Sequence, residues 1–204
     1  MTETKQIQNF KIFDLYDLAE VKVTDPGLAC AINLEPKLIL KSYGRNVSKL
    51  GQTKVNIVER LMNKLSVAGH RGKKHRLILG HVTGKYTQNM KIILDAFKLI
   101  EKKTQKNPVQ VLINALENSA PRDEITVIEY GGARYPQAVD VSPLRRINLA
   151  LKHIVHGAGD KAFNKKKNIV QALAEEIMMA AEGNMESFAM KKKNEAEKQA
   201  DSAR

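Results

Sequence analysis

Apolar residues recur every three or four positions along much of the chain, which is the spacing of one face of an α-helix. Glycines, prolines and polar residues lie between these segments and mark turns. The pattern predicts amphipathic helices that each bury one side against their neighbours. The expected helices cover approximately residues 35–43, 54–68, 87–104, 108–119, 143–156 and 168–182.

Capping residues and glycines indicate where these helices begin and end. Thr53 is in position to cap the first of the longer helices. Asn107 and Ser142 each precede a proline, which is favoured in the first helical turn. Gly157 and Gly159 are expected to end the helix that follows Ser142.

A different period appears in residues 124–141, where apolar and polar positions alternate as in a β-strand. Gly131 and Gly132 lie in the middle of this segment and supply the positive φ angles of a tight turn. We therefore predict a β-hairpin arm with Arg134 and Tyr135, a cation and a stacking surface, at its tip. The whole pattern predicts a mainly α fold, a helical bundle of about six helices with one protruding β-hairpin arm.

The sequence shows no internal repeat and no linker long enough to separate two domains. We expect a partly irregular N-terminal arm over residues 1–30 and a helical domain over residues 31–190. Within that domain, Glu175 and Glu176 are expected to lie opposite the apolar side of their helix. The segment from Asn184 has apolar residues only at its beginning, so it should be helical where these pack and frayed beyond, in the basic C-terminal tail of residues 191–204.

Charge is distributed very unevenly along the chain, which has a net charge of +12. Residues 41–106 hold 16 Lys and Arg against 3 Asp and Glu, whereas residues 1–40 hold 4 against 6 and residues 107–204 hold 14 against 13. A solvated lysine-rich surface or a basic membrane-surface helix are alternatives, but the clustering and the absence of Trp favour a polyanion such as RNA. Because only 5% of residues are aromatic, contacts with phosphates and RNA shape fit better than the reading of exposed bases.

Several other classes of protein receive no support from the sequence. No apolar run approaches the length of a membrane span and the first residues lack the layout of a signal peptide, so we expect a cytoplasmic protein. Cys30 is the single cysteine, which excludes an intramolecular disulfide and a cysteine-based zinc site and favours a buried thiol. His153 and His156 are three residues apart, but no third ligand accompanies them, so we expect no metal and no cofactor.

One segment comes close to an enzymatic motif. Residues 80–85, Gly-His-Val-Thr-Gly-Lys, are similar to a phosphate-binding loop. Such a loop needs four residues between its glycines and a Ser or Thr after the Lys, whereas here three residues intervene and Tyr86 follows. An RNA-dependent nucleotide hydrolase therefore remains only an alternative, as does a free-standing nucleic-acid-binding regulator, and we predict that the protein is not an enzyme.

Segments spread over the chain resemble those of one known family. They are Asn107-Pro108, Ala115-Leu116-Glu117-Asn118, Gly131-Gly132-Ala133-Arg134-Tyr135, Val139-Asp140-Val141-Ser142-Pro143-Leu144-Arg145-Arg146 and Ala174-Glu175-Glu176. In this order the chain resembles the universal small-subunit ribosomal protein S-seven family over about residues 30–204. Residues 47–87 and the ending Asp201-Ser202-Ala203-Arg204 resemble the archaeal and eukaryotic versions, of which we favour the archaeal.

The resemblance implies a structural constituent of the small ribosomal subunit. Such a protein binds the 3′ major domain of small-subunit rRNA directly and nucleates assembly of the subunit head. It lies near the exit (E) site and the mRNA exit channel, with its hairpin close to tRNA. The implied partners are small-subunit rRNA, E-site tRNA and mRNA, and neighbouring ribosomal proteins of the head and platform. We expect a monomer when the protein is free.

Basic residues gather where the chain is expected to leave its helical core, and the resemblance implies that they face rRNA. These candidates are Lys41, Arg45, Arg60, Lys64, His70, Arg71, Lys73, Lys74, Arg76, Arg145, Arg146, Lys165, Lys166 and Lys167. The candidates for the hairpin near tRNA and mRNA are Gly131, Gly132, Arg134 and Tyr135. An alternative for Arg145 and Arg146 is pairing with Asp140 or Glu129, which would brace the hairpin.

Overall fold

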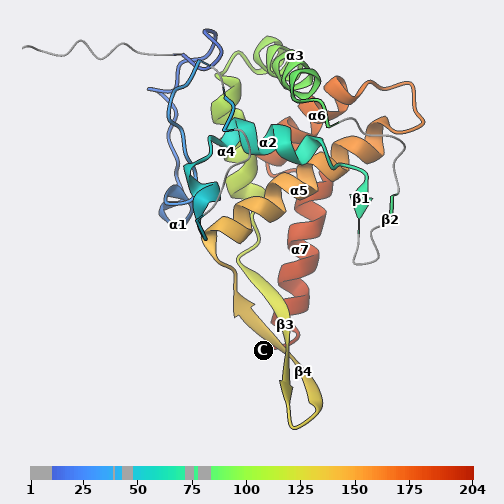
Figure 1. Ribbon diagram of the computed structural model, residues 1–204. Helices are drawn as coiled ribbons and strands as arrows, with labels where there is room; N and C mark the ends of the chain where they lie inside the picture. Colours follow the sequence, from blue (N-terminus) through green and yellow to red (C-terminus); the bar gives the residue numbers. More distant parts are fainter. Residues whose placement is uncertain (1–10, 39, 43–47, 72–75, 78–83) are drawn as a thin grey trace, which may run out of the picture.

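The computed structural model describes residues 11–38, 40–42, 48–71, 76, 77 and 84–204, with the backbone alone for residues 70, 71, 76 and 77. Figure 1 shows a helical body from which one long hairpin projects. The elements are α1 (Pro26–Ala29), the 3₁₀ helix η1 (Gly51–Lys54), α2 (Ile57–Leu65), β1 (His70–Arg71), β2 (Arg76–Leu77), α3 (Tyr86–Thr104), α4 (Pro108–Ser119), β3 (Asp123–Tyr130), β4 (Ala133–Asp140), α5 (Pro143–Ala162), α6 (Ile169–Ala181) and α7 (Phe188–Asp201).

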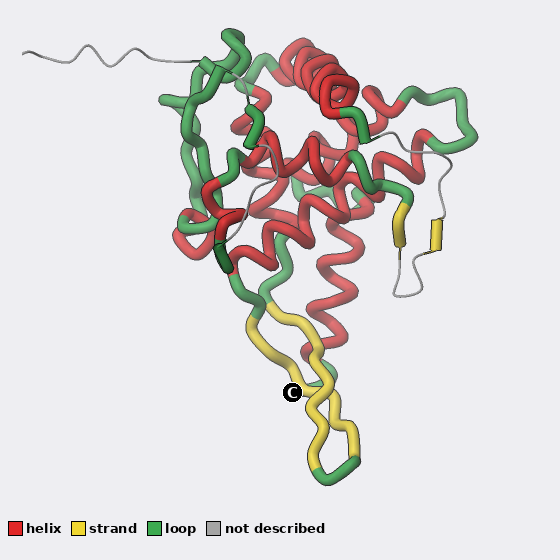
Figure 2. Tube along the Cα trace, in the orientation of Figure 1, coloured by secondary structure: helices red, strands yellow, loops and turns green. Residues whose placement is uncertain are grey.

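Helix α6 lies at the centre of the body and contacts α3, α4, α5 and α7. Its side chains Leu173 and Ile177 are fully buried, as are Phe97 of α3 and Leu112 of α4. Figure 2 shows that strand structure in the described part of the chain is confined to the long hairpin and to the short β1–β2 pair. The predicted fold, mainly helical with a protruding β-hairpin arm, is confirmed.

The region before α2 differs from its sequence-based prediction. No helix forms in the described residues of the range 35–43, where Asn56 instead donates its side-chain amide to the Glu35 carbonyl at 2.9 Å. Thr53 is not the cap of α2, because it lies within η1, which ends at Lys54 before that helix begins. Asn56 caps α2, and its Oδ1 accepts the Val58 N–H at 2.9 Å.

Helix α5 does not stop at its glycines but continues to Ala162. A Cβ atom added at Gly157 would lie 2.7 Å from the Phe188 Cβ and 2.8 Å from the Glu176 Cδ. Neither distance leaves room for a side chain. Gly157 is therefore explained by the close approach of α6 and α7 to α5, and not by termination of the helix.

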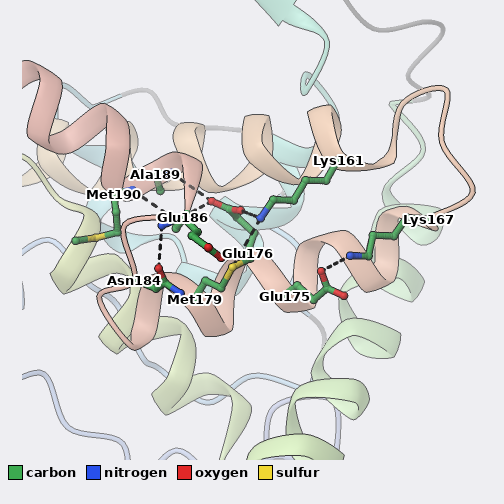
Figure 3. A network of polar contacts seen from close by, with 10 residues as sticks. Lys161, Lys167, Glu175, Glu176, Met179, Asn184, Glu186, Ala189 and Met190 are labelled. Atoms are coloured by element: carbon green, nitrogen blue, oxygen red, sulfur yellow. Dashed lines mark hydrogen bonds and ion pairs between the residues drawn. The ribbon is translucent and has the colours of Figure 1, made fainter.

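A buried carboxylate joins three helices at this point (Figure 3). Glu176 of α6 is fully buried, although the sequence pattern placed it with Glu175 on the exposed side. Lys161 Nζ of α5 donates to Glu176 Oε2 at 2.6 Å. At the start of α7, Ser187 Oγ and the Ala189 N–H donate to Glu176 Oε1 at 2.7 and 3.2 Å. The polar face of α6 thus becomes an internal contact with both neighbouring helices.

The C-terminal segment is more ordered than the sequence indicated. Helix α7 continues without a break to Asp201 and contacts β3. The Arg122 N–H, just before β3, donates to Glu197 Oε1 at 3.1 Å. Arg204 Nη2 lies 2.6 Å from Asp123 Oδ2. The prediction of a frayed end was wrong, because the base of the hairpin packs against this polar segment. The sequence of the segment has no apolar pattern that indicates such a contact.

The N-terminal arm is bound to the helical body by specific polar contacts. Glu117 of α4 accepts the N–H groups of Thr24 and Asp25 at 2.6 and 2.9 Å. Asp25 in turn caps α1 and pairs with Arg146 of α5. Cys30, which was expected to be buried, is exposed beyond α1.

Replacing Glu176 by Gln should destabilise the protein strongly, because Lys161 would lose its buried countercharge. We expect the free energy of unfolding to fall by about 3 kcal/mol in urea titrations. Glu175→Gln is the matched control, since Glu175 is adjacent, partly exposed and paired with the partly exposed Lys167. It should change the unfolding free energy by less than about 1 kcal/mol. Equal effects of the two substitutions would contradict this role for Glu176.

His153 of α5 gives stability a pH dependence. Burial, followed by the nearby charges of Lys152 and Lys192, lowers the pKa of His153 from 6.5 to about 4, although Glu195 and Glu124 oppose the shift. Its Nδ1 has no hydrogen-bond partner, and its ring lies 6.3 Å from that of Phe188 on α7.

Because the folded state binds the His153 proton less tightly than the unfolded state, stability should fall as the pH drops from about 6.5 towards 4. Between pH 7 and pH 5 we expect a loss of about 2 kcal/mol that His153→Gln does not show. Urea unfolding of both proteins at each pH measures the difference, in which the shared carboxylate contributions cancel. Parallel pH profiles would disprove the assignment to His153.

Candidate nucleic-acid interface

Helix α5 presents a row of polar and basic residues along its outer side. Arg145, Asn148 and Lys152 follow one another at helical spacing, and Arg145 and Lys152 are exposed. Asn148 also donates to Gln52 Oε1 of η1 at 3.0 Å. This row was only partly predicted, because Lys152 and Asn148 were overlooked. The spacing of three and four residues from Arg145 was the available signal.

Lys64 of α2 adds a third cation beside Arg145 and Lys152, since α2 packs against α5. Burial, and then the charges of Lys152 and Arg60, lower the pKa of Lys64. No ion pair joins Lys64 or Lys152 to a carboxylate among the described residues. Lys64 and Lys152 repel each other, and a phosphate bound between them would offset this repulsion. The pair is therefore a favourable site for a phosphate.

Arg60 does not belong to this surface. It is 5% exposed, and its Nη1 donates to the Ala31 carbonyl at 2.7 Å while its Nη2 donates to Asn148 Oδ1 at 3.3 Å. Burial lowers the pKa of Arg60 to about 10. We therefore correct the sequence-based assignment, because the guanidinium points into the body and reaches the surface only through Asn148.

Arg145 and Arg146 have different partners and different positions. Arg145 forms a two-pronged ion pair with Glu124 of β3, at 2.6 Å from Nε and 2.8 Å from Nη2. The hydrogen bond between them raises the pKa of Arg145 and lowers that of Glu124. Bracing of the hairpin was weighed from sequence, but its acceptor is Glu124 rather than Asp140 or Glu129. The Arg146 side chain is 12% exposed and pairs with Asp25, so it anchors the N-terminal arm and we leave it out of the interface.

The loop between α5 and α6 carries further positive charge. Lys165 and Lys166 are exposed, whereas Lys167 pairs with Glu175 of α6. In Figure 1 this loop lies at the same end of the body as β1 and β2. Strand pairing places Arg71 opposite Arg76 in that short hairpin, next to His70. Lys73, Lys74 and Arg45 lie outside the described residues and stay sequence-based predictions.

Lys41 lies near the start of α3, where its Nζ is 5.6 Å from the centre of the Tyr86 ring. The Tyr86 hydroxyl donates to the Leu40 carbonyl. Burial, and secondarily Glu59, raise the pKa of Tyr86 to about 12, so the hydroxyl keeps its proton. Tyr86 thus fixes residue 40 to α3, a structural role at the position where a phosphate-binding loop would have its metal ligand.

The long hairpin carries two tyrosines and one basic residue, Arg134, near its turn. Gly131 and Gly132 have φ angles of 58° and 80°, as predicted for the turn. Strand register places Ile128 opposite Tyr135 and Tyr130 opposite Ala133, so these four side chains share one face. Tyr130 and Tyr135 are 82% and 58% exposed. Arg134, on the other face, is 3.6 Å from Glu129. Tyr130 was not singled out from sequence, although its position beside the turn indicated exposure.

Two findings bear on other kinds of site. In the described part of the chain, no three His, Cys, Asp or Glu side chains gather where they could hold a metal ion. Within the same residues, no helix is both long and apolar enough to cross a membrane.

Comparison with known proteins identifies the family. The sequence model of the ribosomal protein S7p/S5e family matches residues 34–204. Small ribosomal subunit protein uS7 of Nanoarchaeum equitans is 49% identical over 195 residues, covering 95% of this chain and 98% of the relative. The uS7 proteins of Thermoplasma volcanium and Cenarchaeum symbiosum are 46% and 42% identical, covering 95% and 100% of this chain and the full length of each relative. These three relatives are archaeal proteins. The chain therefore belongs to the ribosomal protein S7p/S5e family, among the structural, non-enzymatic proteins of the small ribosomal subunit.

Proposed function

We propose that this protein binds the 3′ major domain of small-subunit rRNA directly and nucleates assembly of the subunit head. Its helical body contacts rRNA phosphates, while the long hairpin extends towards the E site and the mRNA exit channel and contacts tRNA. Neighbouring proteins of the head and platform are further partners, and the free protein is a monomer. Family membership supports the ribosomal role. The positions of the exposed cations support the assignment of rRNA binding to the helical body and of tRNA contact to the hairpin.

The observation that carries the proposal is the pair Lys64 and Lys152 on one side of the body, with Arg145 two helical turns from Lys152. Three cations along two packed helices match a backbone that carries a charge on every nucleotide. The hairpin differs, because its exposed side chains near the turn include two tyrosines and aliphatic residues, and its Arg134 has a carboxylate beside it. Such a surface suits stacking on a base or on another protein better than phosphate binding.

Filter binding with the isolated 3′ major domain tests the proposal as a whole. Affinity for this RNA should exceed that for an unrelated structured RNA of equal length and should fall by orders of magnitude as salt rises. Equal affinity for both RNAs would overturn direct recognition of this domain.

The double substitution Lys64→Gln with Lys152→Gln should weaken rRNA binding by about tenfold or more at low salt and reduce the salt slope by about 1.5 to 2. The reason is the loss of two phosphate contacts. Lys102→Gln with Lys103→Gln removes the same charge from the exposed end of α3 and is the matched control. If both pairs weaken binding equally, net charge rather than this surface governs affinity.

The double substitution Arg134→Gln with Tyr135→Ala should leave rRNA affinity within about twofold, because neither side chain belongs to the basic row of α5. Reconstituted subunits that carry it should bind E-site tRNA more weakly by about threefold or more, since base stacking is worth about 1 kcal/mol or more. Filter binding of labelled deacylated tRNA to the purified subunits measures this effect. A large loss of rRNA affinity would contradict the assignment of the two surfaces.

A further inference from the structure

The hairpin is held at its base from both faces. Asp123 and Glu124 are neighbours in β3, so their side chains point to opposite faces of the strand pair. Arg204, beyond the end of α7, pairs with Asp123 at 2.6 Å. Arg145 of α5 holds Glu124 on the other face. Two arginines from distant parts of the chain therefore form ion pairs with two adjacent carboxylates.

The grip on Glu124 uses a side chain that also faces the basic row. The Arg145 side chain is 57% exposed and precedes Lys152 by two helical turns on the same side of α5. Its Nε and Nη2 already form a planar fork around two carboxylate oxygens. Two oxygens of a phosphate fit the same fork with the same geometry.

The exchange of one acceptor for the other is close to balance. Exposed ion pairs shift an equilibrium by about 1.4- to fivefold, and the two-pronged geometry places the pair of Arg145 and Glu124 at the upper end of that range. The Glu124 side chain is 33% exposed. Lys152 also attracts the Glu124 carboxylate, since its charge contributes to lowering the pKa of Glu124, so a phosphate that takes the place of Glu124 keeps this second cation nearby. The contacts of Arg204 with Asp123 and of Glu197 with the Arg122 N–H do not involve Arg145. The hairpin base therefore keeps its contact with α7 when Glu124 is released.

We propose that Glu124 is an internal competitor of RNA: its carboxylate occupies the fork of Arg145 in the free protein, and an rRNA phosphate displaces it on binding. RNA binding by the body thereby removes one of the two ion pairs that hold the hairpin base, the pair between Arg145 and Glu124. This inference rests on the proposed binding of rRNA by the helical body.

Glu124→Gln should therefore tighten binding of the 3′ major domain RNA, because an amide holds the fork less strongly than a carboxylate. Glu129→Gln is the matched control, since it removes the same charge from the same strand and also leaves an arginine, Arg134, without its carboxylate. We expect Glu124→Gln to bind about two- to fivefold more tightly than Glu129→Gln at moderate salt. Equal affinities of the two variants would overturn the proposal.

A double-mutant cycle with Arg145→Gln separates competition from any general charge effect. When Arg145 is absent, Glu124→Gln should give no advantage over Glu129→Gln. An advantage that persists would show that Glu124 acts by repelling RNA directly and would overturn the competition. Circular dichroism of each variant verifies that the chain is folded before binding is compared.

Binding measurements on the wild-type protein and on the two glutamate variants distinguish failure of the proposed rRNA binding from failure of the proposed competition. If the wild-type protein binds the 3′ major domain no better than an unrelated RNA, the proposed function fails. If the wild-type protein binds selectively but the two glutamate variants coincide, rRNA binding stands and the role of Glu124 is refuted.

Discussion

The Glu176 carboxylate is the interaction on which the arrangement of the last three helices depends. It has no exposure to water and receives hydrogen bonds from α5 and from the beginning of α7. A buried charge is tolerated only when its partners are fixed, so these contacts determine where α7 begins and in which direction it leaves the body. Gly157 makes the arrangement possible, because any side chain there would occupy the space of the carboxylate. The direction of α7 then determines which part of β3 it can hold.

Ion pairs in the protein divide into those that build the fold and those that lie open at its surface. Lys161 pairs with the buried carboxylate of Glu176, and the mostly buried Arg146 pairs with Asp25 of the N-terminal arm. Arg145 is intermediate, since it is paired and yet largely exposed. Total charge alone therefore overstates the number of cations available to a polyanion, and burial decides which of them remain accessible.

The sequence predicted the family, the helical class, the hairpin and its turn because each depends on local period or on short motifs. It failed where a residue's role depends on distant partners. Glu176 has the sequence pattern of an exposed position, but its contacts with α5 and α7 bury it. The prediction that Arg60 faces rRNA was wrong for the same reason, since its hydrogen-bond acceptor, the Ala31 carbonyl, is 29 residues away in the sequence. Asp25 and Arg146 are 121 residues apart, so no local pattern relates them.

The contacts between α7 and the hairpin also concern the order in which the chain is synthesised. Glu197 and Arg204 follow their partners Arg122 and Asp123 by 75 and 81 residues. A two-stranded hairpin on its own is at best marginally stable in water. During translation the strands therefore leave the ribosome long before the helix that supports them, and the arm acquires its final direction only when the last helix has been made.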